Sequence, residues 1–219
     1  MKTNLLKQVA TGAIISVSAV SMNFIGATSA QAIDFTFTTT FDKDNDVQLV
    51  DFSIDSDRNI TLFSSSWDDG GLDPIMGLWD ANGDLIREQD DIRSTGSIFS
   101  NGVEYDYGVW DNNFTEFLVA GSYTVSIGQF DNVASGSNLG DGFVHDGPGN
   151  ENFTAEFGCT QGSFCGLNEP NDNRTNSVTF HILGADSIQG IPEPGTVVGI
   201  LAVGLFGATV RRVKKSKPS

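Results

Sequence analysis

The feature that most limits the fold of this chain is the alternation of apolar and polar residues in short runs. Residues 50–54 read VDFSI and residues 178–182 read VTFHI, and similar runs recur between them. A period of two residues is typical of β-strands that bury one face. Between residues 33 and 190 no window has a convincing helical stripe. The pattern therefore favours an all-β domain.

Turn residues separate these runs and narrow the predicted fold class. Asn82-Gly83 lies between two apolar runs and is the strongest hairpin signal in the chain, and Ala120-Gly121-Ser122 marks a second turn. Residues 136–176 have few strand signals, so we expect that stretch to be rich in loops. About seven to nine short strands with such turns predict a β-sandwich or jelly-roll domain over residues 33–190.

The charge of this domain excludes one class of partner. The chain has 28 acidic and 12 basic residues. Residues 33–190 hold 27 of the acids and five of the bases, a net charge of 5 − 27 = −22. Such a surface repels phosphate backbones, so nucleic-acid binding is excluded.

The N-terminus reads as an export signal. Two lysines precede an apolar stretch from Val9 to Ile25, and Ala30-Gln31-Ala32 supplies a small-x-small cleavage pattern. We therefore expect residues 1–32 to be a signal peptide that a signal peptidase removes, leaving a mature start near Ile33. The alternative is an uncleaved amphipathic helix.

The C-terminus carries a second signal. Residues 195–210 are uncharged and mostly apolar, and the basic residues Arg211 and Arg212 follow at once. Sixteen residues make a helix of roughly 24 Å, which is short for a hydrocarbon core of about 30 Å but can span it with some thinning. The basic cluster places that end in the cytoplasm and residues 33–194 outside. We expect a single transmembrane helix here.

Pro192-Glu193-Pro194 stands immediately before this helix. The order of these three residues, a short glycine-rich helix and a basic tail resembles the PEP-CTERM protein-sorting signal of Gram-negative bacteria, here over residues 191–219. The resemblance implies an exosortase-type processing enzyme as partner, and delivery from the inner membrane to the cell surface or an extracellular polysaccharide matrix. The alternative is a permanent single-pass anchor.

The exported region has a second, looser resemblance. Residues 52–54, 72–83, 90–91 and 118–127 together look like the bacterial pre-peptidase C-terminal (PPC) domain. Secreted PEP-CTERM proteins built on that domain tend to carry a Cys-containing loop before the final strand, as residues 157–165 do. The resemblance implies a β-sandwich with an accessory, non-catalytic role.

Cys159 and Cys165 are the only cysteines. An even count in an exported protein favours a disulfide, and neither His145 nor His181 has a recognisable metal-ligand spacing to them. The sequence therefore predicts a disulfide that closes a small loop in the strand-poor stretch.

Clustered acids suggest a calcium site. Asp42, Asp44 and Asp46 alternate in one loop and could converge on a hard cation, although Val47 and Ser53 stand where an EF-hand needs Gly and Glu. A second candidate set lies at another end of the sandwich. That set comprises Asp68, Asp69, Asp73, Asp90 and Asp91. The alternative is that these residues only form turns and keep the protein soluble.

Evidence for catalysis is weak. The chain lacks a GxSxG motif. We expect His181 to face outward from the last strand and His145 to lie in a solvated loop. Trp79 follows a strand pattern and is expected in the core, whereas Tyr107 and Trp110 lie in a glycine-rich loop and are candidates for sugar contact.

The sequence thus predicts an exported surface or matrix protein with a non-catalytic structural or binding sandwich, calcium as its candidate cofactor, and an exopolysaccharide or surface glycan as its candidate ligand. The alternatives are a secreted hydrolase of glycans or peptides and a calcium-dependent carbohydrate-binding adhesin.

Overall fold

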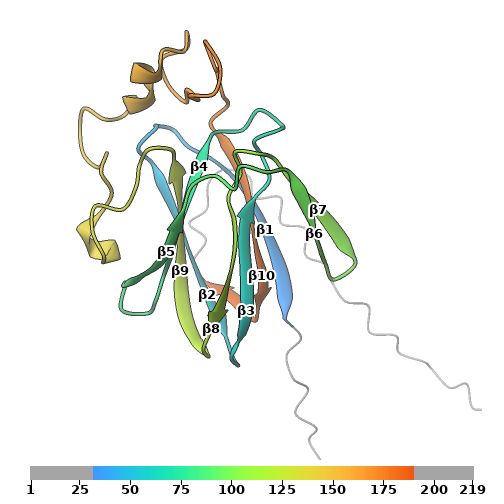
Figure 1. Ribbon diagram of the computed structural model, residues 1–219. Helices are drawn as coiled ribbons and strands as arrows, with labels where there is room; N and C mark the ends of the chain where they lie inside the picture. Colours follow the sequence, from blue (N-terminus) through green and yellow to red (C-terminus); the bar gives the residue numbers. More distant parts are fainter. Residues whose placement is uncertain (1–31, 190–219) are drawn as a thin grey trace, which may run out of the picture. The chain divides into compact units, whose positions relative to one another are not determined.

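The structure is a computed structural model that describes residues 32–189. Its strands form two antiparallel sheets that face each other, and a separate two-stranded hairpin (Figure 1). The first sheet has the order β1 (Ile33–Thr40), β10 (Ser177–Ala185), β3 (Arg58–Ser64), β8 (Asn113–Leu118). The second has the order β11 (Ser187–Gln189), β2 (Val47–Ile54), β9 (Gly121–Gln129), β4 (Pro74–Trp79), β5 (Leu85–Gln89). The hairpin pairs β6 (Gly96–Ser100) with β7 (Val103–Tyr107).

The core lies between the two sheets and follows the alternation in the sequence. Phe52 of β2 and Val125 of β9 meet Leu62 of β3 and Phe180 of β10 in one buried cluster. Trp79 is also fully buried, but on the opposite face of β4 from the core residues Met76 and Leu78, where its Nε1 donates to Ser126 Oγ at 2.9 Å and its ring packs edge-on against Phe143. The all-β fold is therefore confirmed, and the inward residues are those that the period of two selects.

The predicted turns have different roles. Asn82-Gly83 does lie in a hairpin turn, because β4 and β5 pair on either side of it. The turn at residues 120–122 instead carries the chain from β8 of the first sheet to β9 of the second. After β9, the stretch up to residue 176 holds only two short 3-10 segments, η1 (Leu139–Asp141) and η2 (Phe153–Phe157), so the loop-rich prediction is confirmed.

The β6–β7 hairpin lies outside the sequence prediction. Its turn is Asn101-Gly102, with φ angles of +45° and +84°. Positive φ at both central positions is the geometry that Asn-Gly favours in tight hairpins. Tyr107 is consequently the last residue of β7 and not part of a loop, which corrects the expectation for that residue.

The predicted disulfide is present. Cys159 and Cys165 are bonded, and their Cα atoms are 5.4 Å apart. Cys165 is fully buried, and its N–H donates to Thr154 Oγ1 at 3.0 Å. The bond thus lies in the long loop, beside a contact that also holds η2.

We expect replacement of both cysteines with serine to lower the free energy of unfolding by about 2–3 kcal/mol, because the bond restricts the unfolded chain. Urea unfolding of the two proteins measures the change. Added reductant should destabilise the wild-type protein by a similar amount and leave the double variant unaffected. Equal urea midpoints for the two oxidised samples would contradict the prediction.

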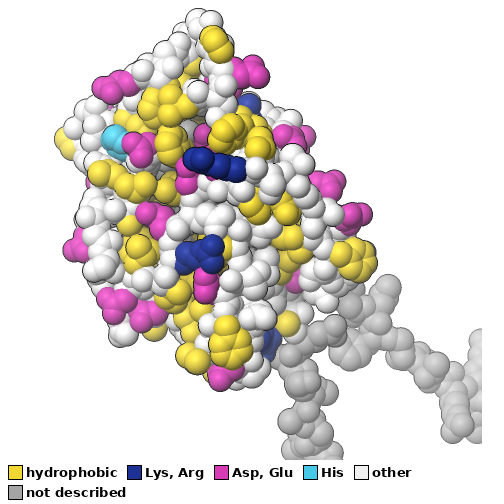
Figure 2. All heavy atoms as spheres, viewed as in Figure 1, with side chains coloured by type: hydrophobic (Ala, Val, Ile, Leu, Met, Phe, Trp, Pro, Cys, Tyr) yellow, Lys and Arg dark blue, Asp and Glu magenta, His cyan; other side chains and the backbone are white. Residues whose placement is uncertain are grey.

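Within residues 32–189, no helix is long and apolar enough to cross a membrane. The predicted signal peptide, the predicted membrane helix, Pro192, Glu193 and Pro194 lie outside the described residues. Acidic side chains are spread over the face drawn in Figure 2, and basic ones are few. Arg87 binds Glu116 at 2.7 Å and links the edge strands β5 and β8 of the two sheets.

Candidate metal centre

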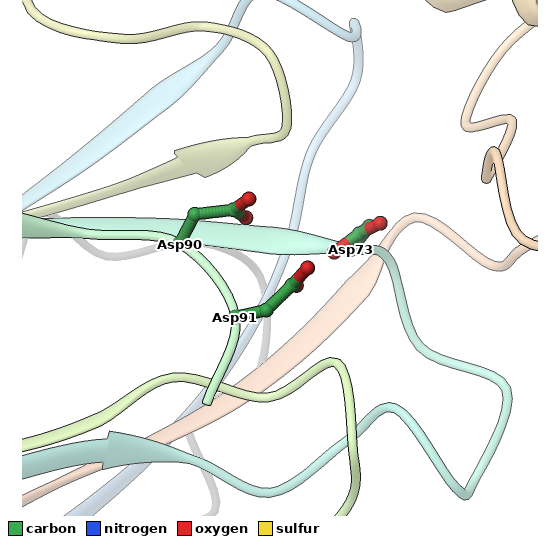
Figure 3. A group of neighbouring side chains, drawn as sticks. All are labelled: Asp73, Asp90 and Asp91. Atoms are coloured by element: carbon green, nitrogen blue, oxygen red, sulfur yellow. The ribbon is translucent and has the colours of Figure 1, made fainter. Parts of the chain in front are cut away.

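Three aspartates meet at one end of the second sheet. Asp73 comes immediately before β4, and Asp90 and Asp91 follow β5 directly. Because β4 and β5 are antiparallel, with Met76 opposite Gln89, the start of one strand lies beside the end of the other. One oxygen from each carboxylate lies within 4.8 Å of the others. Figure 3 shows the three side chains extending toward the same space.

Burial makes the charge on these carboxylates costly. Asp73 is only 4% exposed. Its burial raises its pKa to about 8, and the nearby Asp91 and Asp90 add to the effect, which Arg174 partly offsets. Burial likewise raises the pKa of Asp91 to about 7, with a further contribution from Asp90. The pKa of Asp90 is raised as well, chiefly by burial. Such a group gains stability from a cation that neutralises it.

The fold leaves some of the carboxylate oxygens at this site without a partner. One buried oxygen of each of Asp73, Asp90 and Asp91 has no hydrogen-bond partner. Buried polar atoms are normally paired, so three orphaned oxygens at one place need an explanation. A bound cation would supply the missing partner.

Two buried amides flank the aspartates. Gln129 is fully buried, both of its amide atoms lack a partner, and it pairs with Pro74 in the β4–β9 ladder. Asn112 donates from Nδ2 to Pro74 O at 2.8 Å, while its Oδ1 is unpartnered. Carboxylate and amide oxygens are the ligands that calcium prefers, with a variable number and flexible geometry. The residues present therefore fit calcium, with Asp73, Asp90 and Asp91 as the charged ligands.

Asp73, Asp90 and Asp91 belong to the second candidate set predicted from the sequence, whereas the amides of Gln129 and Asn112 are absent from both sets. A signal for Gln129 existed, because Tyr123, Val125 and Ile127 all point inward and the same alternation continues to residue 129. An inward glutamine at the end of a strand is unusual enough to indicate a polar site. Asp68 and Asp69, from the same set, are exposed and do not join the group.

The preferred candidates, Asp42, Asp44 and Asp46, do not converge within the part of the chain that the structure describes. Asp44 is fully buried and accepts hydrogen bonds from Thr154 N at 2.9 Å and Phe164 N at 2.7 Å. Asp46 turns toward the N–H groups of Asp42 and Lys43. These carboxylates accept hydrogen bonds that hold the loops together. The expectation that Asp42, Asp44 and Asp46 converge on one cation is therefore corrected.

The segment that leads to Asp73 is held by Arg174. Its guanidinium lies 3.4 Å from the centre of the Trp67 ring and donates from Nε to Gly71 O at 2.8 Å. Asp172, beside Arg174 in the long loop, lies 3.6 Å from its guanidinium. Arg174 therefore attaches the loop that contains the disulfide to the chain segment that leads into Asp73.

Of the aromatic candidates, Trp110 lies beside the segment that follows the aspartates, because Ile92 N donates to Asp111 O and Arg93 N donates to Val109 O, both at 2.9 Å. Trp110 packs edge-on against Trp67 with ring centroids 6.2 Å apart, and both Trp110 and Tyr107 are half-buried. Sugar contact by Tyr107 and Trp110 stays a prediction.

His181 faces outward from the last strand, as expected, since its neighbours Phe180 and Ile182 lie in the core, but its side chain is buried there. Tyr105 of the β6–β7 hairpin covers it edge-on, and Phe63 stacks on it at 4.2 Å. Its Nδ1 lies 2.9 Å from Thr36 Oγ1, and its Nε2 lies 2.7 Å from Ser65 Oγ. Burial lowers the pKa of His181 to about 4, so the imidazole is neutral near pH 7.

Comparisons with known proteins bear on one end of the chain. A search of curated proteins finds no significant match. The profile of the PEP-CTERM protein-sorting motif matches residues 190–215, which include Pro192, Glu193, Pro194, Arg211 and Arg212. The motif indicates export, a C-terminal membrane-anchored signal before processing, and an exosortase-type enzyme as processing partner. The chain is therefore an exported, exosortase-sorted protein that carries a PEP-CTERM protein-sorting motif.

Proposed function

We propose that the sandwich is a non-catalytic, calcium-binding module that works at the cell surface or in the extracellular matrix. The observation that carries this proposal is the convergence of Asp73, Asp90 and Asp91, each with a buried oxygen that lacks a partner. Calcium is the common hard cation outside cells, and extracellular modules bind it with dissociation constants of about 10⁻⁴–10⁻³ M. An exported protein meets calcium at such concentrations.

A binding role is supported by the contacts of His181 and of the two cysteines, the residue types that often act in catalysis. Both ring nitrogens of His181 lie within hydrogen-bond distance of hydroxyl groups beneath Tyr105, and its ring stacks on Phe63. Cys159 and Cys165 are joined in the disulfide. The aspartates lie at the end of a rigid sheet, where a cation would join the β4 and β5 segments.

The relation to PPC domains belongs to the same proposal. The segment 72–83 that carries the resemblance becomes Asp73, β4 and the β4–β5 turn, and residues 90–91 supply the two other aspartates. Residues 118–127 become the crossing from β8 to β9. The strand-turn pattern behind the resemblance thus coincides with the elements that position the candidate metal centre.

The test is to isolate the protein from the cell surface and the medium, map both of its termini, and measure its bound calcium by mass spectrometry. We expect an N-terminus near Ile33, a C-terminus within residues 190–215, and calcium that a chelator removes. A cytosolic protein with its N-terminal segment intact would contradict the location. Correctly processed protein free of calcium, even after dialysis against millimolar calcium, would contradict the metal-binding role.

A further inference from the structure

An open groove of about 580 Å³ lies on the outer face of the second sheet, away from the metal centre. Asp51 of β2, Ser122 and Thr124 of β9, and Gln189 of β11 line its floor. These side chains point outward, because the residues between them, such as Phe52 and Tyr123, point into the core. The β4–β5 turn and the segment around η1 form its walls.

The walls are fixed before any ligand arrives. Asn138 donates from Nδ2 to Asn82 O at 3.1 Å and to Asp84 Oδ1 at 3.2 Å, and Leu139 N donates to Gly83 O at 2.7 Å. The two turns are therefore joined to each other. A preformed site loses less conformational entropy on binding than a flexible one.

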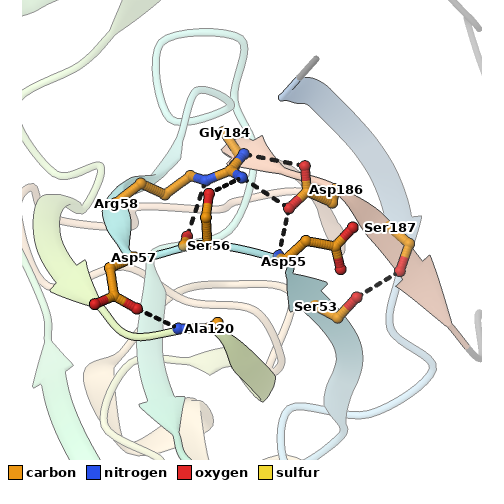
Figure 4. A network of polar contacts seen from close by, with 9 residues as sticks. All are labelled: Ser53, Asp55, Ser56, Asp57, Arg58, Ala120, Gly184, Asp186 and Ser187. Atoms are coloured by element: carbon orange, nitrogen blue, oxygen red, sulfur yellow. Dashed lines mark hydrogen bonds and ion pairs between the residues drawn. The ribbon is translucent and has the colours of Figure 1, made fainter. Parts of the chain in front are cut away.

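The floor is also held in place. Thr124 Oγ1 donates to Asp51 Oδ1 at 2.7 Å. The hydroxyl groups of Ser187 and Ser53 lie 2.7 Å apart and fix β11 to β2 (Figure 4). Asp186, just before β11, binds the Arg58 guanidinium at 3.0 Å and accepts from Asp55 N. The strand that supplies Gln189 is thus anchored at its start.

The lining selects a chemical class of ligand. Carboxylate, amide and hydroxyl side chains line it together with the apolar residues Ala81 and Leu139, and no lysine or arginine of the described residues lines it. Negative charge from Asp51 and Asp80 opposes anions, as does the net charge of −22 on residues 33–190. Sugar hydroxyls both donate and accept hydrogen bonds, so they can pair with each of these groups. The volume lies within the range of about 300–1,000 Å³ that ligand sites occupy.

We propose that this groove binds a segment of a neutral polysaccharide. The proposal rests on the proposed function for its extracellular setting, since an exported module meets such polymers there. It does not depend on calcium, because the groove lies at the turn end of the β4–β5 hairpin and the aspartates lie at the other end. The chain's own continuation after Gln189 is a poorer occupant, because Glu193 would add a negative charge beside Asp51 and Asp80.

The test is native affinity electrophoresis of the full-length chain in a detergent without a sugar headgroup. The gels contain dextran, galactomannan or xyloglucan as neutral polymers, or alginate as an anionic one. We expect retardation in at least one neutral gel and none in alginate. Ser122→Trp, which places a large side chain on the exposed floor, should raise the dissociation constant at least tenfold. Asn59→Trp, an equally exposed change on the outer face of the first sheet, should leave it unchanged.

The outcomes separate the two proposals. Retardation of Asp90→Asn equal to that of the wild type would show that the groove acts without the metal centre, even if calcium binding fails. Absence of retardation in all three neutral gels, or equal retardation of Ser122→Trp and the wild type, would overturn the groove proposal and leave the calcium proposal standing.

Discussion

Replacing Asp90 and Asp91 with asparagine should weaken calcium binding by about 100-fold or more, because two of the three charged ligands become neutral while the shape of the site is kept. Isothermal titration calorimetry of the full-length chain in detergent measures the affinity. The wild-type protein should also melt at a higher temperature in calcium than in chelator, since a ligand that binds only the folded state stabilises it. The double variant should lose this shift.

In chelator the same variant should be more stable than the wild type. Burial and mutual repulsion raise the pKa values of Asp73 and Asp91, so their ionised forms are costly without a cation. A variant that binds no calcium and yet melts higher in chelator cannot owe its loss of binding to misfolding. Asp69→Asn is the matched control, because Asp69 is exposed and lies outside the group. Retention of wild-type affinity by the double variant would contradict the site.

The fold was predictable because its main signal is local. Alternation within 50–54 and 178–182 fixes which face of β2 and β10 is buried, and that face meets the opposite sheet. The β6–β7 hairpin was missed although Asn101-Gly102 carries the same hairpin signal as Asn82-Gly83. Its flanking residues are mostly polar or half-exposed, so the alternation that revealed the other strands is weak there.

The metal site was less predictable because it depends on contacts that are distant in sequence. Asp42, Asp44 and Asp46 looked better as a local pattern, but Asp44 serves Thr154 and Phe164, more than a hundred residues away. Asp73 and Asp90 meet only because β4 and β5 pair in a particular register. The spacing of residues along the chain does not reveal the register in which two strands pair. It also does not reveal which carboxylates already accept hydrogen bonds from other parts of the fold.

Acidification should destabilise the protein through His181. Burial lowers its folded-state pKa to about 4, whereas an unfolded histidine titrates near 6.5. The unfolded state therefore binds a proton first as the pH falls, and the stabilisation that is fully present above pH 6.5 is lost between about pH 6.5 and pH 4. The loss should be on the order of 3 kcal/mol. The buried environment comes from Phe63, Thr36, Ser65 and Tyr105.

His181→Gln isolates this contribution, because the pKa values of Asp73 and Asp91, raised by burial to about 8 and about 7, add a pH dependence that the variant shares with the wild type. Glutamine retains polar atoms toward the two hydroxyl groups but takes up no proton in this range. We expect the variant to be less stable at pH 7, where it loses the stacking of the imidazole on Phe63, and the difference from the wild type to shrink as the pH falls to 4. Urea midpoints at pH 7, 5.5 and 4.5 measure both proteins, and a constant difference between His181→Gln and the wild type would show that the buried imidazole does not set the acid sensitivity of the fold.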